Sequence, residues 1–120
     1  MKRKKFNLFD NFMNSINGLV EVFQNEKPMQ VEVFSFILMS IVLIFLEMPL
    51  FYKLILFTSL FIPMFAEILN SAVERCVDLV TPEYHKLAKH AKDAGSAAVL
   101  LALVITGLIW LTILLKVYVL

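Results

Sequence analysis

The sequence predicts an all-α integral membrane protein, built as one domain with three transmembrane helices and an N-terminal amphipathic interfacial helix. Three observations lead to this class. Sixty per cent of the 120 residues are hydrophobic, more than so short a chain can bury in a water-soluble core. The mean hydropathy is +0.81. Residues 94–115 contain no charge, and such a run can cross a hydrocarbon core of ~30 Å as a helix.

The first expected element is an amphipathic helix over residues 6–24. Its apolar residues recur at helical spacing, and asparagines and acidic residues lie mainly on the other side. The apolar set is Phe9, Phe12, Met13, Ile16, Val20 and Phe23. Such a helix can lie in the membrane interface or pack on the spanning helices, and the two are compatible. The basic start resembles the beginning of a signal peptide, but the next residues are too polar for one.

Three membrane helices follow, over about residues 29–48, 50–80 and 93–118. The first two contain charge-free runs at 33–46 and 54–66, and Met48–Leu50 is the expected turn between them. Pro63 is a candidate kink in the second helix. Glu67 interrupts the apolar pattern of that helix, which then resumes.

The basic residues predict the orientation in the membrane. Residues 1–32 hold five Lys and Arg, residues 75–92 hold four, and the opposite side holds only Lys53 and Lys116. Because cytoplasmic segments carry an excess of Lys and Arg, we expect the N-terminus and the 75–92 region to face the cytoplasm.

Glycine and cysteine usage excludes several classes of site. The three glycines form no P-loop, no kinase glycine loop and no dinucleotide fingerprint. Cys76 is the only cysteine, so the chain has neither an internal disulfide nor a cysteine-based zinc site.

Four polar residues of the second membrane helix share one face. Glu67, Asn70, Glu74 and Asp78 stand at i, i+3, i+7 and i+11. With a rise of ~1.5 Å per residue from the outer boundary, Glu67 lies ~24 Å across the ~30 Å core, just inside the cytoplasmic edge. An ionisable group there needs a partner or a function. The alternatives are a polar contact between helices for Glu67 and solvated helix-end residues for Glu74 and Asp78.

Other candidate residues gather on the same side of the membrane. Glu26 and Glu32 enter from the start of the first membrane helix. Glu26 with Glu74 would suit Mg²⁺, a hard cation that binds carboxylate and phosphate oxygens, although residues 25–28 also read as an ordinary polar turn.

The segment before the third membrane helix offers a second group. Thr81 is expected to cap a helical turn that begins at Pro82. Tyr84 and His85 could stack on a base or donate to phosphate, or could be interfacial anchors. Lys92 and Asp93 precede small residues 94–98, where a phosphate could dock or helices could pack closely.

These residues resemble the small prokaryotic membrane diacylglycerol kinases over about residues 18–115. The strongest part is AEILNSAVE at Ala66–Glu74. Asp78, then Glu83-Tyr84-His85, and AKDAGSAAVLLA at Ala91–Ala102 follow in the family's order.

The resemblance implies a homotrimer in the bacterial cytoplasmic (inner) membrane, multi-pass, that transfers the γ-phosphate of Mg-ATP to diacylglycerol and gives phosphatidic acid. This is a reaction of phospholipid metabolism, with Mg²⁺ as cofactor and no nucleic acid as partner. Glu67 would be the general base, supported by Asn70, and Glu26 and Glu74 would hold Mg²⁺ with ATP. The residues implied to contact ATP are Glu83, Tyr84, His85, Lys92 and Asp93. Ser96, like Glu67, would lie near the lipid substrate.

The sequence departs from the family's pattern at several positions, and other functions remain as alternatives. The N-terminal helix is rich in Asn and Phe where the family carries Trp and Tyr, and Val31 stands where the family has glutamine. Residues 77–85 also resemble the related undecaprenol kinases, whereas Ala94–Val99 favours the diacylglycerol branch. A small proton-coupled transporter and a non-enzymatic membrane assembly subunit are the readings from other classes.

Overall fold

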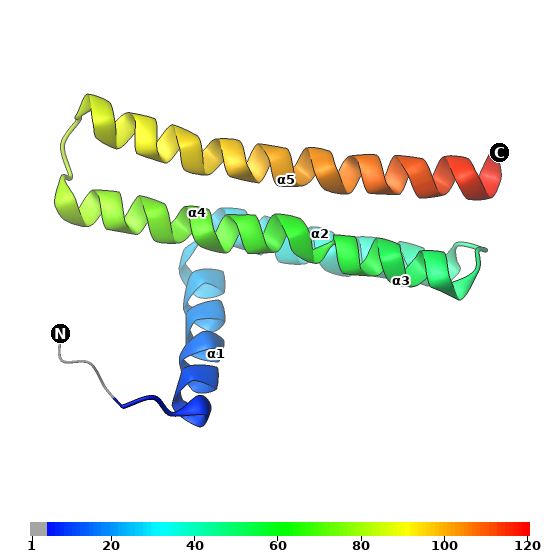
Figure 1. Ribbon diagram of the computed structural model, residues 1–120, viewed down its shortest axis with the longest axis horizontal. Helices are drawn as coiled ribbons and strands as arrows, with labels where there is room; N and C mark the ends of the chain where they lie inside the picture. The colour runs from blue at the N-terminus through cyan, green and yellow to red at the C-terminus, as the bar shows by residue number, and fades with distance from the viewer. Residues whose placement is uncertain (1–4) are drawn as a thin grey trace.

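The computed structural model describes residues 5–120, which form five helices. They are α1 (Leu8–Asn25), α2 (Lys27–Phe45), α3 (Leu50–Ser59), α4 (Phe61–Val80) and α5 (Lys86–Tyr118). The basic residues Lys2, Arg3 and Lys4, which contribute to the expected orientation, lie outside the described range. Figure 1 shows α2, α3–α4 and α5 side by side along the long axis, with α1 running across it.

Helix α1 confirms the expected amphipathic helix, with small differences at its ends. Asn7 caps it, because its side-chain oxygen accepts from the backbone N–H of Phe9 at 3.0 Å and of Asp10 at 3.4 Å. The helix ends at Glu26, whose backbone is extended, and Pro28 then stands in the first turn of α2. Proline suits the start of a helix because its missing N–H has no intrahelical partner there. This break turns the chain from α1 into the first long apolar helix.

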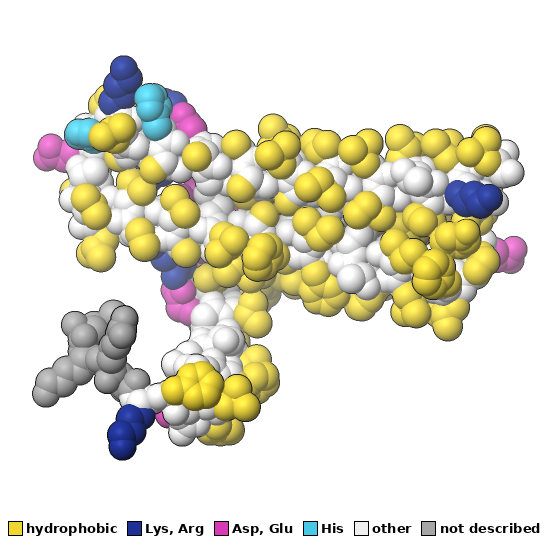
Figure 2. All heavy atoms as spheres, viewed as in Figure 1, with side chains coloured by type: hydrophobic (Ala, Val, Ile, Leu, Met, Phe, Trp, Pro, Cys, Tyr) yellow, Lys and Arg dark blue, Asp and Glu magenta, His cyan; other side chains and the backbone are white. Residues whose placement is uncertain are grey.

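Three apolar helices are long enough to cross a membrane: Lys27–Phe45, Leu50–Val80 and Lys86–Tyr118. Most of their large hydrophobic side chains are exposed, as expected for surfaces that contact lipid rather than water. Figure 2 shows apolar side chains along the length of the bundle, and charged ones concentrated near the α4–α5 turn and near α1. The expected all-α membrane fold is therefore confirmed.

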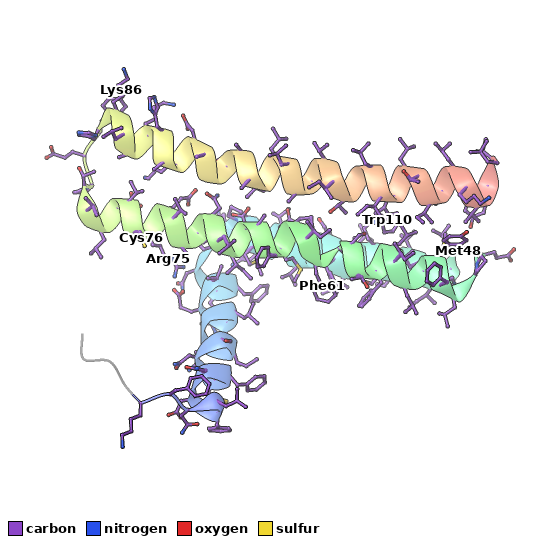
Figure 3. The ribbon with its side chains drawn as sticks, viewed as in Figure 1. Met48, Phe61, Arg75, Cys76, Lys86 and Trp110 are labelled. Atoms are coloured by element: carbon purple, nitrogen blue, oxygen red, sulfur yellow. The ribbon has the colours of Figure 1, made fainter. Side chains whose placement is uncertain are left out.

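The second span is interrupted at the single residue Leu60, whose backbone stays in the right-handed helical region, so that α4 continues in the direction of α3 (Figure 1). Pro63 has no N–H to pair with the carbonyl of Ser59, four residues earlier. Thr106 of α5 supplies a donor instead, because its hydroxyl lies 3.2 Å from that carbonyl oxygen. Trp110 donates to the Ser59 hydroxyl at 3.0 Å, and Figure 3 shows Trp110 on the side of α5 that faces this division. The regular helix is thus interrupted at Leu60, three residues before the expected kink position at Pro63, and α5 supplies a donor to the carbonyl that Pro63 leaves unpaired.

The connection from α4 to α5 differs from expectation. Thr81 ends α4 instead of capping a turn at Pro82: its N–H donates to Val77 at 2.9 Å, and its hydroxyl to the Glu83 carbonyl at 3.3 Å. Helix α5 begins at Lys86, about two turns before residue 93, with His85 as its cap. The apolar pattern did not reveal this early start, because the first turns of α5 are polar and exposed.

Candidate active site

The buried face of α4 carries polar side chains. Glu67, Asn70 and Ser71 are 6%, 7% and 1% exposed, and Glu74 is half-buried one turn further on. Asp78 is exposed near the end of the helix. The face predicted from the spacing therefore runs from a buried carboxylate to a solvent-accessible one.

Asn70 lies against both Glu74 and helix α5. Its side-chain amide donates to Oε1 of Glu74 at 3.3 Å. Its Oδ1 is buried and accepts no hydrogen bond within the described residues. A Cβ added to Gly95 would lie 2.2 Å from Oδ1, so α4 and α5 can approach this closely only because residue 95 is glycine. Ser96 follows directly on α5 and is exposed.

Carboxylates of α2 and of the α1–α2 junction face the same part of α4. Helix α2, which bears Glu32, packs against α4, which bears Glu67 and Glu74. The sequence places Glu32 on the same side of the membrane as Glu26 but gives it no role. Its position at the start of a membrane helix, where a charge is costly, was the available signal.

This donor set can be compared with the needs of Mg²⁺. Within residues 5–120, no three His, Cys, Asp or Glu side chains form a group that could hold a metal ion alone. In nucleotide sites Mg²⁺ commonly takes one or two carboxylates together with substrate phosphates. Carboxylates at Glu26 and Glu74, with the unpaired amide oxygen of Asn70, are hard oxygen donors of the required kind. The oxygens of these side chains are chemically suited to Mg²⁺.

An open groove lies between the end of α4 and the start of α5. All five residues implied to contact ATP line it: Glu83, Tyr84, His85, Lys92 and Asp93. Lys92 lies 2.6 Å from Oδ1 of Asp78, and Lys89 lies 2.6 Å from Oδ2 of Asp93. The fold thus brings this part of the expected set together.

His85 has a defined orientation in the groove because it caps α5. Its Nδ1 accepts from the backbone N–H of Leu87 at 3.1 Å. A neutral imidazole that accepts at Nδ1 carries its proton on Nε2. That nitrogen can therefore donate to an oxygen of a bound ligand.

Arg75 was considered in the sequence only as one of the basic residues that set the orientation. In the structure it pairs with Glu26 at 3.0 Å and also with Glu21. The Arg75 hydrogen bond holds the pKa of the Glu21 carboxyl below its usual range. Because Arg75 lies about fifty residues from both glutamates in the chain, sequence spacing gave no signal of this contact.

Comparison with known proteins identifies the family. The model of the family described as prokaryotic diacylglycerol kinase matches residues 13–114. A diacylglycerol kinase of Escherichia coli K12 is 36% identical over 96 residues, covering 80% of this chain and 79% of that protein. One from Haemophilus influenzae is 38% identical over 96 residues, covering 80% and 81%. An undecaprenol kinase of Bacillus subtilis is 33% identical over 105 residues, covering 88% and 85%. The chain belongs to the prokaryotic diacylglycerol kinase family.

Proposed function

We propose that this protein is an ATP-dependent lipid kinase that phosphorylates diacylglycerol to phosphatidic acid at the cytoplasmic face of the bacterial inner membrane. One observation carries the proposal beyond family membership. A single face of α4 bears the buried carboxylate of Glu67 and continues to Asp78 in the groove beside α5. A lipid hydroxyl at the headgroup level and a water-borne nucleotide can therefore meet along one helix.

The chemistry follows from these positions. Glu67 would accept the proton of the lipid hydroxyl. The lipid oxygen would bond to the γ-phosphorus of ATP, while the bond from that phosphorus to the leaving ADP oxygen breaks. Asn70 would keep the neighbouring carboxylates in place through its bond to Glu74. Ser96, on α5 directly after Gly95, would contact the lipid.

The groove would hold ATP through Glu83, Tyr84, His85, Lys92 and Asp93. Mg²⁺ held by Glu26 and Glu74 would neutralise charge on the phosphates. Phosphoryl transfer depends mainly on positioning and charge neutralisation. A small helical scaffold without a P-loop is sufficient for that.

Two further parts of the proposal rest on charge and on the family. The excess of Lys and Arg in residues 1–32 and 75–92 supports a cytoplasmic location for the groove, with the N-terminus on the same side. The family resemblance implies a homotrimer with active sites between protomers. Cross-linking of the purified protein in lipid bilayers would give a trimer band if this holds, and a monomer band alone would contradict it.

The activity is tested with labelled ATP and lipid in mixed micelles. We expect phosphatidic acid from the wild type and a fall in kcat of roughly 10²–10⁴-fold in Glu67→Gln. Glu47→Gln is the matched control, because Glu47 is an exposed carboxylate beyond α2 at the far end of the bundle. Absence of phosphorylated lipid from wild type would refute the kinase, and full activity of Glu67→Gln would refute the general base alone.

Undecaprenol kinase activity is the second candidate, because the Bacillus subtilis undecaprenol kinase matches 88% of this chain. The same assay with undecaprenol decides between them. A higher kcat/KM for undecaprenol than for diacylglycerol would make it the substrate.

A further inference from the structure

Arg75 joins α4 to α1 and to the α1–α2 junction at the edge of the candidate site. It lies on α4 next to Glu74, and Figure 3 shows it on the side of α4 that faces α1. Its Nη1 donates to Oε2 of Glu21 on α1. Its Nε and Nη2 donate to Oε1 of Glu26, at 3.2 and 3.0 Å.

Both bonds to Glu26 use the same carboxylate oxygen. In the part of the chain that the structure describes, Oε2 of Glu26 accepts no hydrogen bond, and the side chain is 25% exposed. Arg75 therefore fixes one oxygen of Glu26 and leaves the other available to a cation.

The charges of the three residues also suit this arrangement. Arg75 alone would neutralise Glu26 and compete with a divalent cation. Glu21, which also pairs with Arg75, adds a second negative charge, so the three side chains together carry −1. Arg75 can therefore orient Glu26 while Glu21 balances the positive charge of the arginine.

The backbone at Glu26 gives its side chain little orientation of its own. Its φ and ψ are −116° and 113°, because it is the extended residue between α1 and α2. The limits that a helical backbone places on side-chain rotamers therefore do not apply to it. The planar fork of an arginine can supply this restriction, whereas a lysine offers one flexible point charge.

We propose that Arg75 is a positioning residue that orients Glu26 for divalent-cation binding, with Glu21 balancing its charge. The inference rests on the proposed function, in which Glu26 is a metal ligand. Carboxylates that bind metals are commonly held by further hydrogen bonds, and loss of such a partner typically weakens metal affinity about 10–100-fold.

The test measures Mn²⁺ binding by electron paramagnetic resonance on the full-length protein in detergent, with a non-hydrolysable ATP analogue. We expect Arg75→Gln to raise the Mn²⁺ dissociation constant about tenfold or more. Arg75→Lys should give an intermediate value, since it keeps the charge without the fork. Glu21→Gln should weaken binding by a smaller factor, because it leaves the arginine charge unbalanced. Lys53→Gln, on α3 far from the site, should bind Mn²⁺ as the wild type does.

Kinetics separates positioning from a structural role. Arg75→Gln should need more Mg²⁺ for half-maximal turnover and recover most of its kcat at high Mg²⁺. A lower melting temperature with unchanged Mn²⁺ affinity would mean that Arg75 only joins the helices. Unchanged or tighter Mn²⁺ binding in both Arg75 variants, or no Mn²⁺ binding by the wild type, would overturn the inference. If the wild type binds Mn²⁺ but phosphorylates neither lipid, the proposed function fails instead.

Discussion

Gly95 of α5 lies directly against Asn70 of α4, so closely that a Cβ at position 95 would stand 2.2 Å from Oδ1 and 3.3 Å from Cγ of the asparagine. The asparagine is buried, and turning its side chain away from position 95 would move the amide that donates to Glu74. Asn70 can therefore hold its position on the acidic face of α4 only if residue 95 is glycine.

Gly95→Ala should displace Asn70 or separate the two helices. We expect overpacking to cost about 1–3 kcal/mol of stability, and misplacement of the acidic face to lower kcat by roughly 100-fold. Lipid phosphorylation and thermal unfolding in detergent measure the two effects. Gly107→Ala is the matched control on the same helix, because nothing lies within 4 Å of a Cβ there. Equal kcat in the two variants would contradict this account of Asn70.

Thr106→Val should lower the stability of the protein by weakening the packing of α5 on the break between α3 and α4. It removes the hydroxyl that donates to the Ser59 carbonyl, and within a membrane such a bond contributes about 0.6–2 kcal/mol. Pro63→Ala restores a backbone N–H that can pair with the same carbonyl. The cost of Thr106→Val should therefore shrink in a Pro63→Ala background, as a double-mutant cycle of unfolding free energies would measure. Additive costs would show that the two donors do not serve one carbonyl.

The features that depend on local spacing were predictable from the sequence. The apolar runs gave the three membrane helices, and the i, i+3, i+7 spacing gave the face of Glu67, Asn70 and Glu74. The start of α5 was missed, because capping by His85 competes with the proline rule that favoured Pro82. The Arg75 contacts with Glu21 and Glu26 depend on how α1 turns away from α2 at Glu26, and no local pattern encodes that direction.

Lys92→Gln should weaken ATP binding. Lys92 lines the groove and is held there by Asp78, 2.6 Å away. Hydrogen bonds to charged groups contribute about 1.5–3 kcal/mol, so we expect the KM for ATP to rise at least roughly tenfold, with a smaller change in kcat. Lys116→Gln, in the last turn of α5 at the other end, should leave KM unchanged.

Asp78→Asn tests whether Lys92 acts on ATP directly or through its pairing with Asp78. It releases Lys92 from its carboxylate partner without removing the cation. The KM for ATP should then stay the same or fall. A rise as large as that of Lys92→Gln would mean that Asp78 itself takes part in nucleotide binding.

The apolar face of α1 should lie in the membrane interface. Phe9 and Phe12 are 69% and 60% exposed, although water disfavours such a surface, and interfacial helices bury it at the level of the lipid headgroups. The single cysteine, Cys76, is first replaced by serine. Spin labels are then introduced by Phe12→Cys on the apolar face and Asn14→Cys on the polar face. In lipid bilayers the label at 12 should be the more accessible to oxygen, and the label at 14 the more accessible to a water-soluble nickel complex. Protection of position 12 from both reagents would instead mean that α1 packs against another protomer, since a protein contact excludes oxygen and nickel alike.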